Sequence, residues 1–225
     1  MKKLFLALTT LFLASCASMP MAQGEVLTVN KDRTIYVKGV ISGMDLIEKA
    51  DKIMKLGEKS KEPIYLVINS PGGAVLPGIQ FISSMNVLQK RGIKFKCFVP
   101  MLAASMAFQI FAECDERYTF KNALHLWHPI RISGNFQALT PQTLMEIYKD
   151  LKAWEDVLVK SLKKKLNIDD DVFEYHYVKE TLHLGSNLKE IAPDFLTIVT
   201  DVKGIPIRFS MREERRGPYL TFPRK

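Results

Sequence analysis

The sequence predicts an α/β domain built from stacked βαβ units. Short apolar stretches alternate with longer segments in which apolar residues recur every three or four positions, a pattern typical of strands joined by helices. One stretch, residues 64–68, is apolar without interruption, as expected for a strand that is buried on both faces. With 225 residues and a hydrophobic content of 47%, the chain can form one substantial core, so we expect a single folded domain.

The first half of the chain contains three consecutive strand–helix pairs. Each expected strand is a short apolar run, and each expected helix shows apolar residues at helical spacing. The second helix is reached through a Pro-Gly-Gly turn and stops at Gly92, because glycine is a common helix terminator. The expected strands span residues 34–37, 64–68 and 95–99, and the expected helices span residues 45–56, 79–92 and 104–112.

The second half of the chain is richer in helix. Two short strands, 117–120 and 124–127, lead into a loop over residues 129–141 that is rich in Gly, Ser, Asn and Thr. A long helix over about residues 142–165 follows, with an apolar stripe that is ample for self-association. Two short helices and a last strand complete the domain, over residues 169–180, 186–191 and 196–202.

The N-terminus has the features of a secretory signal. Lys2 and Lys3 precede an apolar run, residues 4–13, that is too short to span a bilayer comfortably. The sequence Leu-Ala-Ser-Cys over residues 13–16 resembles the bacterial lipobox, which implies cleavage before Cys16 and lipidation of its thiol, with palmitate among the acyl chains; an ordinary signal cut a few residues later is the alternative. Because alanine rather than aspartate follows this cysteine, we expect a lipid-anchored protein of the bacterial cell envelope, at the outer membrane and facing the periplasm.

We therefore divide the chain into four parts. Residues 1–16 form the signal segment with the lipobox cysteine, and residues 17–32 form a polar tether. Residues 33–203 form the folded domain, and residues 204–225 form a basic C-terminal tail.

Charge and cysteine content limit the functions that the chain could have. The formal net charge of +8 gathers in late basic runs, which are expected to be solvated, and no basic motif interleaved with aromatic residues indicates nucleic-acid binding. Cys97 and Cys114 are expected to be buried thiols in apolar elements. A disulfide between them is the alternative, which an exported compartment would permit.

The residues that could take part in catalysis lie in two turns. Gly72 and Gly73 end the buried strand, and glycine lets the backbone approach a ligand closely and adopt positive φ. Ser105 lies among small residues where the third helix begins, so that free amides and the helix dipole would stabilise a developing oxyanion. The amides of Gly73 and Met106 could together form an oxyanion hole. Ser105 taken alone could equally serve as a helix N-cap.

A nucleophilic serine needs a base and an acid. Side chains alternate along the strand that holds His125 and His128, so only one of the two can face Ser105. His128 lies at the exit of the strand, where catalytic groups of α/β folds gather, and is the preferred base. The candidate acids are Glu180 and the aspartate run 169–171, which also reads as a helix cap.

Three short motifs together resemble the Clp protease proteolytic subunit family. They are Ile68-Asn69-Ser70-Pro71-Gly72-Gly73, Ala103-Ala104-Ser105-Met106 and Leu126-Trp127-His128, and the resemblance covers about residues 33–202. It implies the ClpP/crotonase-like fold of stacked βαβ units, in which the helix over residues 142–165 is the long handle helix. It also implies a triad of Ser105, His128 and an acid, with oxyanion amides from Gly73 and Met106. The family's acid lies ten residues before a glutamate of a short helix, which here places it on Glu180.

The resemblance and the expected export lead to a functional hypothesis. We expect an envelope-anchored serine-type endopeptidase that cleaves peptides or unfolded proteins without ATP, because the envelope offers none. No cofactor, metal, nucleic acid or ATPase partner is expected. The handle helix leads us to expect a homo-oligomer, and the lipid anchor leads us to expect membrane contact.

Two alternative functions remain open. One is a Ser-Lys hydrolase that resembles signal peptide peptidases, with Lys149 or Lys152 as the base. The other is a non-catalytic lipoprotein that binds peptides or serves as a scaffold, with a degenerate triad. A crotonase-type acyl-CoA enzyme is disfavoured by the serine-centred motif.

Overall fold

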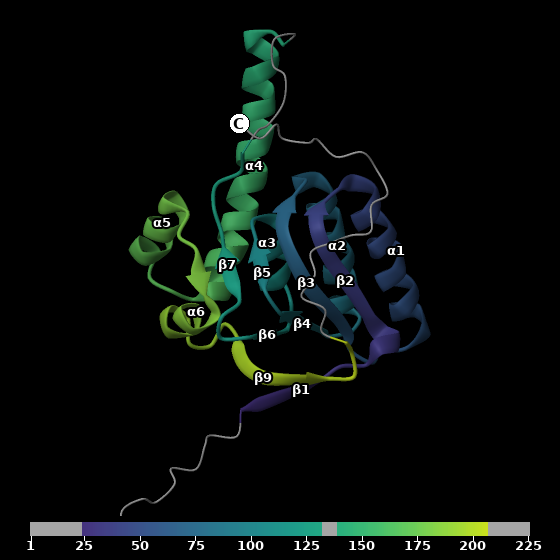
Figure 1. Ribbon diagram of the computed structural model, residues 1–225. Helices are drawn as coiled ribbons and strands as arrows, with labels where there is room; N and C mark the ends of the chain where they lie inside the picture. Colours follow the sequence, from purple (N-terminus) through teal and green to yellow (C-terminus); the bar gives the residue numbers. More distant parts are fainter. Residues whose placement is uncertain (1–23, 132–138, 207–225) are drawn as a thin grey trace, which may run out of the picture.

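The computed structural model describes residues 24–131 and 139–206 (Figure 1). These residues form nine strands and six α-helices, which confirms the predicted α/β fold class. The expected signal segment with Cys16 lies outside the described residues, as does all but the first part of the expected basic tail. Within the described ranges, no helix is long and apolar enough to cross a membrane.

The main sheet is parallel and is centred on the longest strand, β3 (Ile64–Gly73). Its N-terminal half is almost wholly buried, as the unbroken apolar sequence predicts. From one edge to the other the strands follow the order β1, β9, β6, β4, β3 and β2. Their bounds are Glu25–Thr28 for β1, Thr197–Lys203 for β9, Glu116–Thr119 for β6, Phe95–Val99 for β4 and Thr34–Ile41 for β2.

A smaller sheet branches from the C-terminal half of β3. There the edge of β3 that first pairs with β4 passes to β5 (Leu102–Ala104), with Ser70 opposite Ala103. Next come β7 (Leu124–Leu126), which is parallel to β5, and β8 (His183–Leu184), which is antiparallel to β7. The sheet therefore curls at β3, and this curl brings the end of β3 beside the end of β5.

The helices cover the two sheets and enclose the main core. In Figure 1, α1 and α2 lie together at the right of the domain, α5 and α6 lie at its left, and α4 projects beyond it. Every residue of α3 is buried. The bounds are Gly43–Lys59 for α1, Val75–Lys90 for α2, Met106–Ala112 for α3, Pro141–Leu166 for α4, Asp170–Lys179 for α5 and Gly185–Ile191 for α6; a short 3-10 helix spans Lys31–Arg33.

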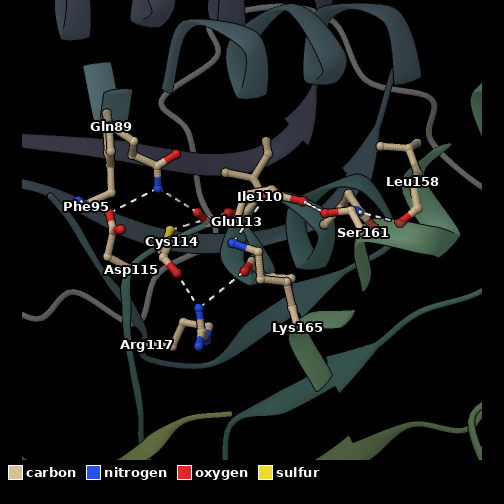
Figure 2. Close-up of polar contacts among 12 residues, drawn as sticks. Gln89, Phe95, Ile110, Glu113, Cys114, Asp115, Arg117, Leu158, Ser161 and Lys165 are labelled. Carbon is tan, nitrogen blue, oxygen red and sulfur yellow. Dashed lines mark hydrogen bonds and ion pairs between the residues drawn. The ribbon is translucent and has the colours of Figure 1, made fainter. Parts of the chain in front are cut away.

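Polar contacts fix the C-terminal end of α3, as Figure 2 shows. The buried Glu113 carboxylate accepts a hydrogen bond from the Ser161 hydroxyl of α4. The Gln89 amide of α2 donates to the backbone carbonyl of Glu113 at 3.0 Å and to Asp115 at 3.0 Å. Asp115 in turn accepts from the Phe95 amide of β4 at 2.8 Å. The short helix is thus tied to three other elements.

Three features differ from the sequence-based expectation. Residues 25–28 fall in the segment expected to be a tether, yet they form β1 and pair with β9. The short strands β5 and β8 were not predicted as strands. The prediction of two free thiols was wrong, because Cys97 of β4 and Cys114 form a disulfide with their Cα atoms 6.0 Å apart.

Candidate active site

The Pro-Gly-Gly turn at the end of β3 lies directly against Ser105. Gly72 has φ of +92°, and a Cβ atom at this position would stand 2.6 Å from the Ser105 Cβ and 2.6 Å from the Ala104 carbonyl oxygen. The Ser70 hydroxyl stabilises the turn by accepting a hydrogen bond from the Gly72 amide at 3.0 Å. Only glycine combines this conformation with this close approach. The two motifs that the sequence marks separately therefore form one site.

Ser105 occupies a sharp turn between β5 and α3. Its backbone has φ of +56° and ψ of −129°, a conformation that costs a residue other than glycine about 1–3 kcal/mol. Hydrogen bonds hold the turn in place, because the Ser105 amide donates to the Leu126 carbonyl at 2.9 Å and the Gln109 amide donates to the Ser105 carbonyl at 3.1 Å. The side chain stands at the N-cap position of α3 but makes no capping hydrogen bond. Ser105 therefore occupies the N-cap position that the alternative interpretation gave it, but its hydroxyl does not cap the helix and is left for another role.

The two residues expected to supply the oxyanion hole both lie close to this serine in the chain or in the fold. Met106 is the first residue of α3, so its amide has no partner within the helix. Gly73 is exposed, has φ of +147°, and ends β3 in the same turn that contacts Ser105. Both residues line the same cleft as Ser105.

This cleft has a volume of about 160 Å³ and an apolar wall. The apolar wall comes mainly from α4, through Leu158, Val159 and Leu162, and from the start of α2, through Val75. Polar groups stand among these apolar side chains, as is typical of ligand-binding clefts. They include Ser105, His128, Gln109, Arg131, Glu155 and Tyr177.

His128 follows β7 and lines the cleft together with Ser105. Its Nδ1 lies 2.6 Å from the Pro129 carbonyl oxygen. Because a carbonyl oxygen can only accept, Nδ1 carries the proton and Nε2 is the basic nitrogen. In the described part of the chain, no hydrogen bond joins His128 to Ser105, a looseness that catalytic pairs often show without substrate.

The structure does not bring Glu180 into hydrogen-bond contact with His128. Glu180 ends α5 in a left-handed conformation, with φ of +52°, and its carboxylate pairs with Arg131. That hydrogen bond is the main reason why the pKa of Glu180 is lowered, and the charge of His128 contributes to the same shift. The aspartate run behaves as the helix-cap interpretation predicts, because Asp169 accepts a hydrogen bond from the Asp171 amide at 2.8 Å.

The remaining candidate bases are placed elsewhere. His125 is fully buried, its Nε2 lies 3.1 Å from the Thr119 hydroxyl, and burial lowers its pKa to about 3. Lys149 is exposed, and neither it nor Lys152 lines the cleft. The pKa of Lys152 is raised, first by its hydrogen bond with Asp156, which is opposite to what a lysine base requires. The alternative of a Ser-Lys hydrolase therefore loses its candidate base.

Sequence reasoning missed several polar residues of the cleft, above all Glu155 of α4. Its carboxylate accepts hydrogen bonds from the Ile130 amide at 2.8 Å and from the Tyr177 hydroxyl at 2.8 Å. A usable signal was present in the sequence, because Glu155 interrupts the apolar stripe of the long helix between Leu151 and Leu158. A charged residue in an apolar stripe requires a partner, and here it has several.

No metal site is found among the described residues, since no group of three or more His, Cys, Asp or Glu side chains is arranged to hold an ion. Among the polar groups of the cleft are a hydroxyl, an imidazole and the backbone amides of Gly73 and Met106. This arrangement can support nucleophilic attack on a carbonyl carbon with stabilisation of the resulting oxyanion.

The chain is similar to known proteases. The family model described as Clp protease matches residues 22–174. The ATP-dependent Clp protease proteolytic subunit of Lactococcus lactis subsp. lactis (strain IL1403) is 28% identical over 164 residues, which cover 69% of this chain and 81% of the relative. The subunit of the same name from Glycine max is 33% identical over 102 residues, which cover 44% of this chain and 50% of the relative.

Proposed function

The chain belongs to the Clp protease family, and we propose that it is a serine-type endopeptidase that cleaves peptides or unfolded proteins through an acyl-enzyme on Ser105. The observation that carries the proposal is the strained turn at Ser105, which lies against Gly72 and leaves the hydroxyl without a capping partner. A nucleophile on such a turn, beside free amides and an imidazole, fits acyl transfer.

The reaction would proceed in two halves. His128 Nε2 takes the proton of the Ser105 hydroxyl as its oxygen attacks the peptide carbonyl, and the amides of Gly73 and Met106 stabilise the oxyanion. Each amide would contribute about 2.7–4 kcal/mol in the transition state. His128 then protonates the leaving amine, and water hydrolyses the ester by the reverse sequence of proton transfers. We assign the acid role to Glu180, whose charge would stabilise the imidazolium from outside the cleft.

We further propose that the enzyme is anchored in the bacterial cell envelope through a lipid on Cys16 and acts without ATP. The N-terminal charge, the apolar run and the lipobox-like cysteine support export. The disulfide between Cys97 and Cys114 supports it independently, because such bonds persist mainly in oxidising compartments. Radiolabelled palmitate should be incorporated by the wild type and not by Cys16→Ser. Equal labelling of both proteins, or labelling of neither, would argue against the anchor.

Hydrolysis of an unfolded substrate tests the proposed activity. Full-length protein in detergent should degrade fluorescein-labelled casein without ATP, and added ATP should leave the rate unchanged. Ser105→Ala and His128→Ala should each lower the rate by at least about 10³-fold, because the nucleophile and base act as a unit. Ser83→Ala, which alters an exposed serine of α2, is the matched control and should behave as wild type. Hydrolysis that survives in Ser105→Ala would show that Ser105 is not the nucleophile, and its absence in the wild type would favour a non-catalytic role.

A further inference from the structure

Within the described residues, two polar contacts attach the segment that carries the proposed base to the rest of the domain, and a third lies inside the segment. This segment, residues 128–131, follows β7 and contacts α4 and the C-terminal end of α5. His128 Nδ1 donates to the Pro129 carbonyl at 2.6 Å, and Arg131 pairs with Glu180. Between these two contacts, the Ile130 amide donates to Glu155 Oε1 at 2.8 Å. The contact of His128 with Pro129 lies within the segment, and the Arg131 side chain of the second contact is 66% exposed. The hydrogen bond to Glu155 is therefore the more protected attachment.

Glu155 is itself firmly held. Its side chain is only 17% exposed, and it receives the Tyr177 hydroxyl of α5 at 2.8 Å and the Lys152 ammonium at 3.3 Å. Burial alone would raise the pKa of Glu155, but the hydrogen bonds from Ile130, Tyr177 and Lys152 outweigh it, and the pKa is lowered. The group is therefore an ionised acceptor at neutral pH, and charged acceptors make stronger hydrogen bonds than neutral ones.

From these contacts we infer that Glu155 is the positioning residue of His128, an inference that rests on the proposed peptidase activity. The Ile130 amide lies two residues beyond His128, and Pro129 between them has a fixed φ. An anchor on that amide therefore limits where the imidazole can stand relative to Ser105. Catalysis is sensitive to such placement, because a displacement of about 1 Å can cost about 10²-fold in rate.

Two other roles for Glu155 predict different effects of substitution. If it served only to neutralise Lys152, it would be redundant, because Asp156 also pairs with that lysine at 2.8 Å. If its charge attracted a basic substrate side chain, the charge rather than the acceptor oxygen would matter. Glu155→Gln separates these roles, because glutamine keeps an oxygen that can accept from Ile130 and Tyr177 but carries no charge.

The test compares three variants of the full-length protein in detergent. Steady-state hydrolysis of a neutral fluorogenic peptide and the rate of Ser105 labelling by a fluorophosphonate are measured for each. Glu155→Ala should lower kcat and the labelling rate by about 10- to 100-fold with little change in KM. Glu155→Gln should retain at least a third of both rates, and so should Asp156→Ala, the control on the same helix. Rates within threefold of wild type for Glu155→Ala, or equal losses for Glu155→Ala and Glu155→Gln, would overturn the inference.

A double substitution checks that the effect passes through the imidazole. In a His128→Ala background, Glu155→Ala should cause no further loss, because a positioning residue has nothing left to position. A further tenfold loss would contradict the inference. If Glu155→Ala fails to fold, Tyr177→Phe takes its place; this change removes one hydrogen bond to the carboxylate and should lower kcat by about two- to fivefold, and an unchanged kcat would count against the inference.

Failure of the proposed function would be visible separately. If the wild type is not labelled at Ser105, the peptidase assignment fails, whatever Glu155 does. The ring resonances of His128 then decide the positioning, because they report the placement of the imidazole without any reaction. A shift in Glu155→Ala that Glu155→Gln restores would support the positioning, and unshifted resonances in Glu155→Ala would overturn it.

Discussion

Backbone conformation at a few residues determines the shape of the candidate site. Ser105 and Gly72 both have positive φ, and they touch where the ends of β3 and β5 meet. The cost of a strained serine, about 1–3 kcal/mol, is tolerated only where surrounding contacts fix the conformation. Here the fixing contacts are the hydrogen bonds of its own amide and carbonyl and the close approach of Gly72.

Substitution of Gly72 tests whether the close approach of the turn to Ser105 matters. Gly72→Ala would place a methyl group 2.6 Å from the Ala104 carbonyl and the Ser105 Cβ, so the turn that holds the serine must move. We expect labelling of Ser105 to fall by at least about 100-fold. Gly92→Ala is the matched control, because Gly92 has a similar φ of +85° but open space where the methyl group would lie. This control should lose only about 1 kcal/mol of stability and keep its labelling rate, measured by urea denaturation and by probe kinetics. Equal losses of labelling in the two variants would show that space at Gly72 is irrelevant.

Individual elements hold this geometry in place, above all α3. At its N-terminal end is Ser105, and just past its C-terminal end Cys114 is bonded to Cys97 of β4. The contacts of Glu113 and Asp115 shown in Figure 2 fix the same end without the disulfide. We therefore expect the disulfide to stabilise the fold rather than to determine the position of α3.

The disulfide predicts a measurable difference in stability. Its sequence separation is 17 residues, and closing a loop of about that length stabilises a fold by about 3 kcal/mol. The double variant Cys97→Ala/Cys114→Ala should lose roughly that amount in urea denaturation followed by circular dichroism. Its labelling rate at Ser105 should stay within about threefold of wild type at 25 °C, since the polar contacts remain. A double variant as stable as the wild type would indicate that the two thiols are not paired.

The histidines of β7 and β8 predict a dependence of stability on pH. Burial lowers the pKa of His125 to about 3 and that of His183 to about 4, whereas an unfolded histidine titrates near 6.5. Below about pH 6.5 the unfolded chain therefore binds protons that the folded chain does not, and the free energy of unfolding falls as the pH drops towards 4. His183→Phe, which keeps an aromatic ring against Trp127, should flatten this fall by about 1–3 kcal/mol in urea denaturation between pH 7 and pH 4. An unchanged slope would contradict the assignment.

Elements with a strong local pattern were predictable from the sequence, and those defined by distant partners were not. The continuous apolar run of β3 and the apolar stripe of α4 can be recognised from the local sequence alone. By contrast, β1 has only four residues and is defined by its pairing with β9, far along the chain. The two-residue strand β8 is too short to show any periodicity.

The residues of the candidate site also fall into those that local sequence predicts and those that it does not. Ser105 and Gly73 lie in local turn motifs that could be recognised in the sequence, and His128 could be proposed from its place at a strand end. The contact of Glu155 with Ile130 depends on how α4 packs against the segment after β7, which no local pattern encodes. The disulfide was missed for a similar reason, because pairing of Cys97 with Cys114 depends on the approach of β4 to the end of α3.

The shape of the whole molecule suggests how copies would associate. The N-terminal part of α4 projects beyond the domain (Figure 1) and exposes Leu144, Met145 and Tyr148. Exposed apolar side chains gathered on one helix are typical of an interface. We expect a chain that begins at Ala17 to form a homo-oligomer in size-exclusion chromatography with light scattering. Met145→Glu/Tyr148→Glu should shift it towards the monomer, whereas Glu146→Gln on the same helix should not. A monomeric parent chain would contradict this expectation.

The central claim is that Ser105 is a nucleophile activated by His128, and active-site labelling tests it most directly. Full-length protein treated with a fluorophosphonate should gain one phosphonyl group, and peptide mapping should locate it on Ser105. Ser105→Ala should gain none, His128→Ala should react at least about 10³-fold more slowly, and Lys149→Ala, an exposed lysine outside the cleft, should react as fast as the wild type. Folded wild-type protein that stays unlabelled, or a label on another residue, would contradict the account.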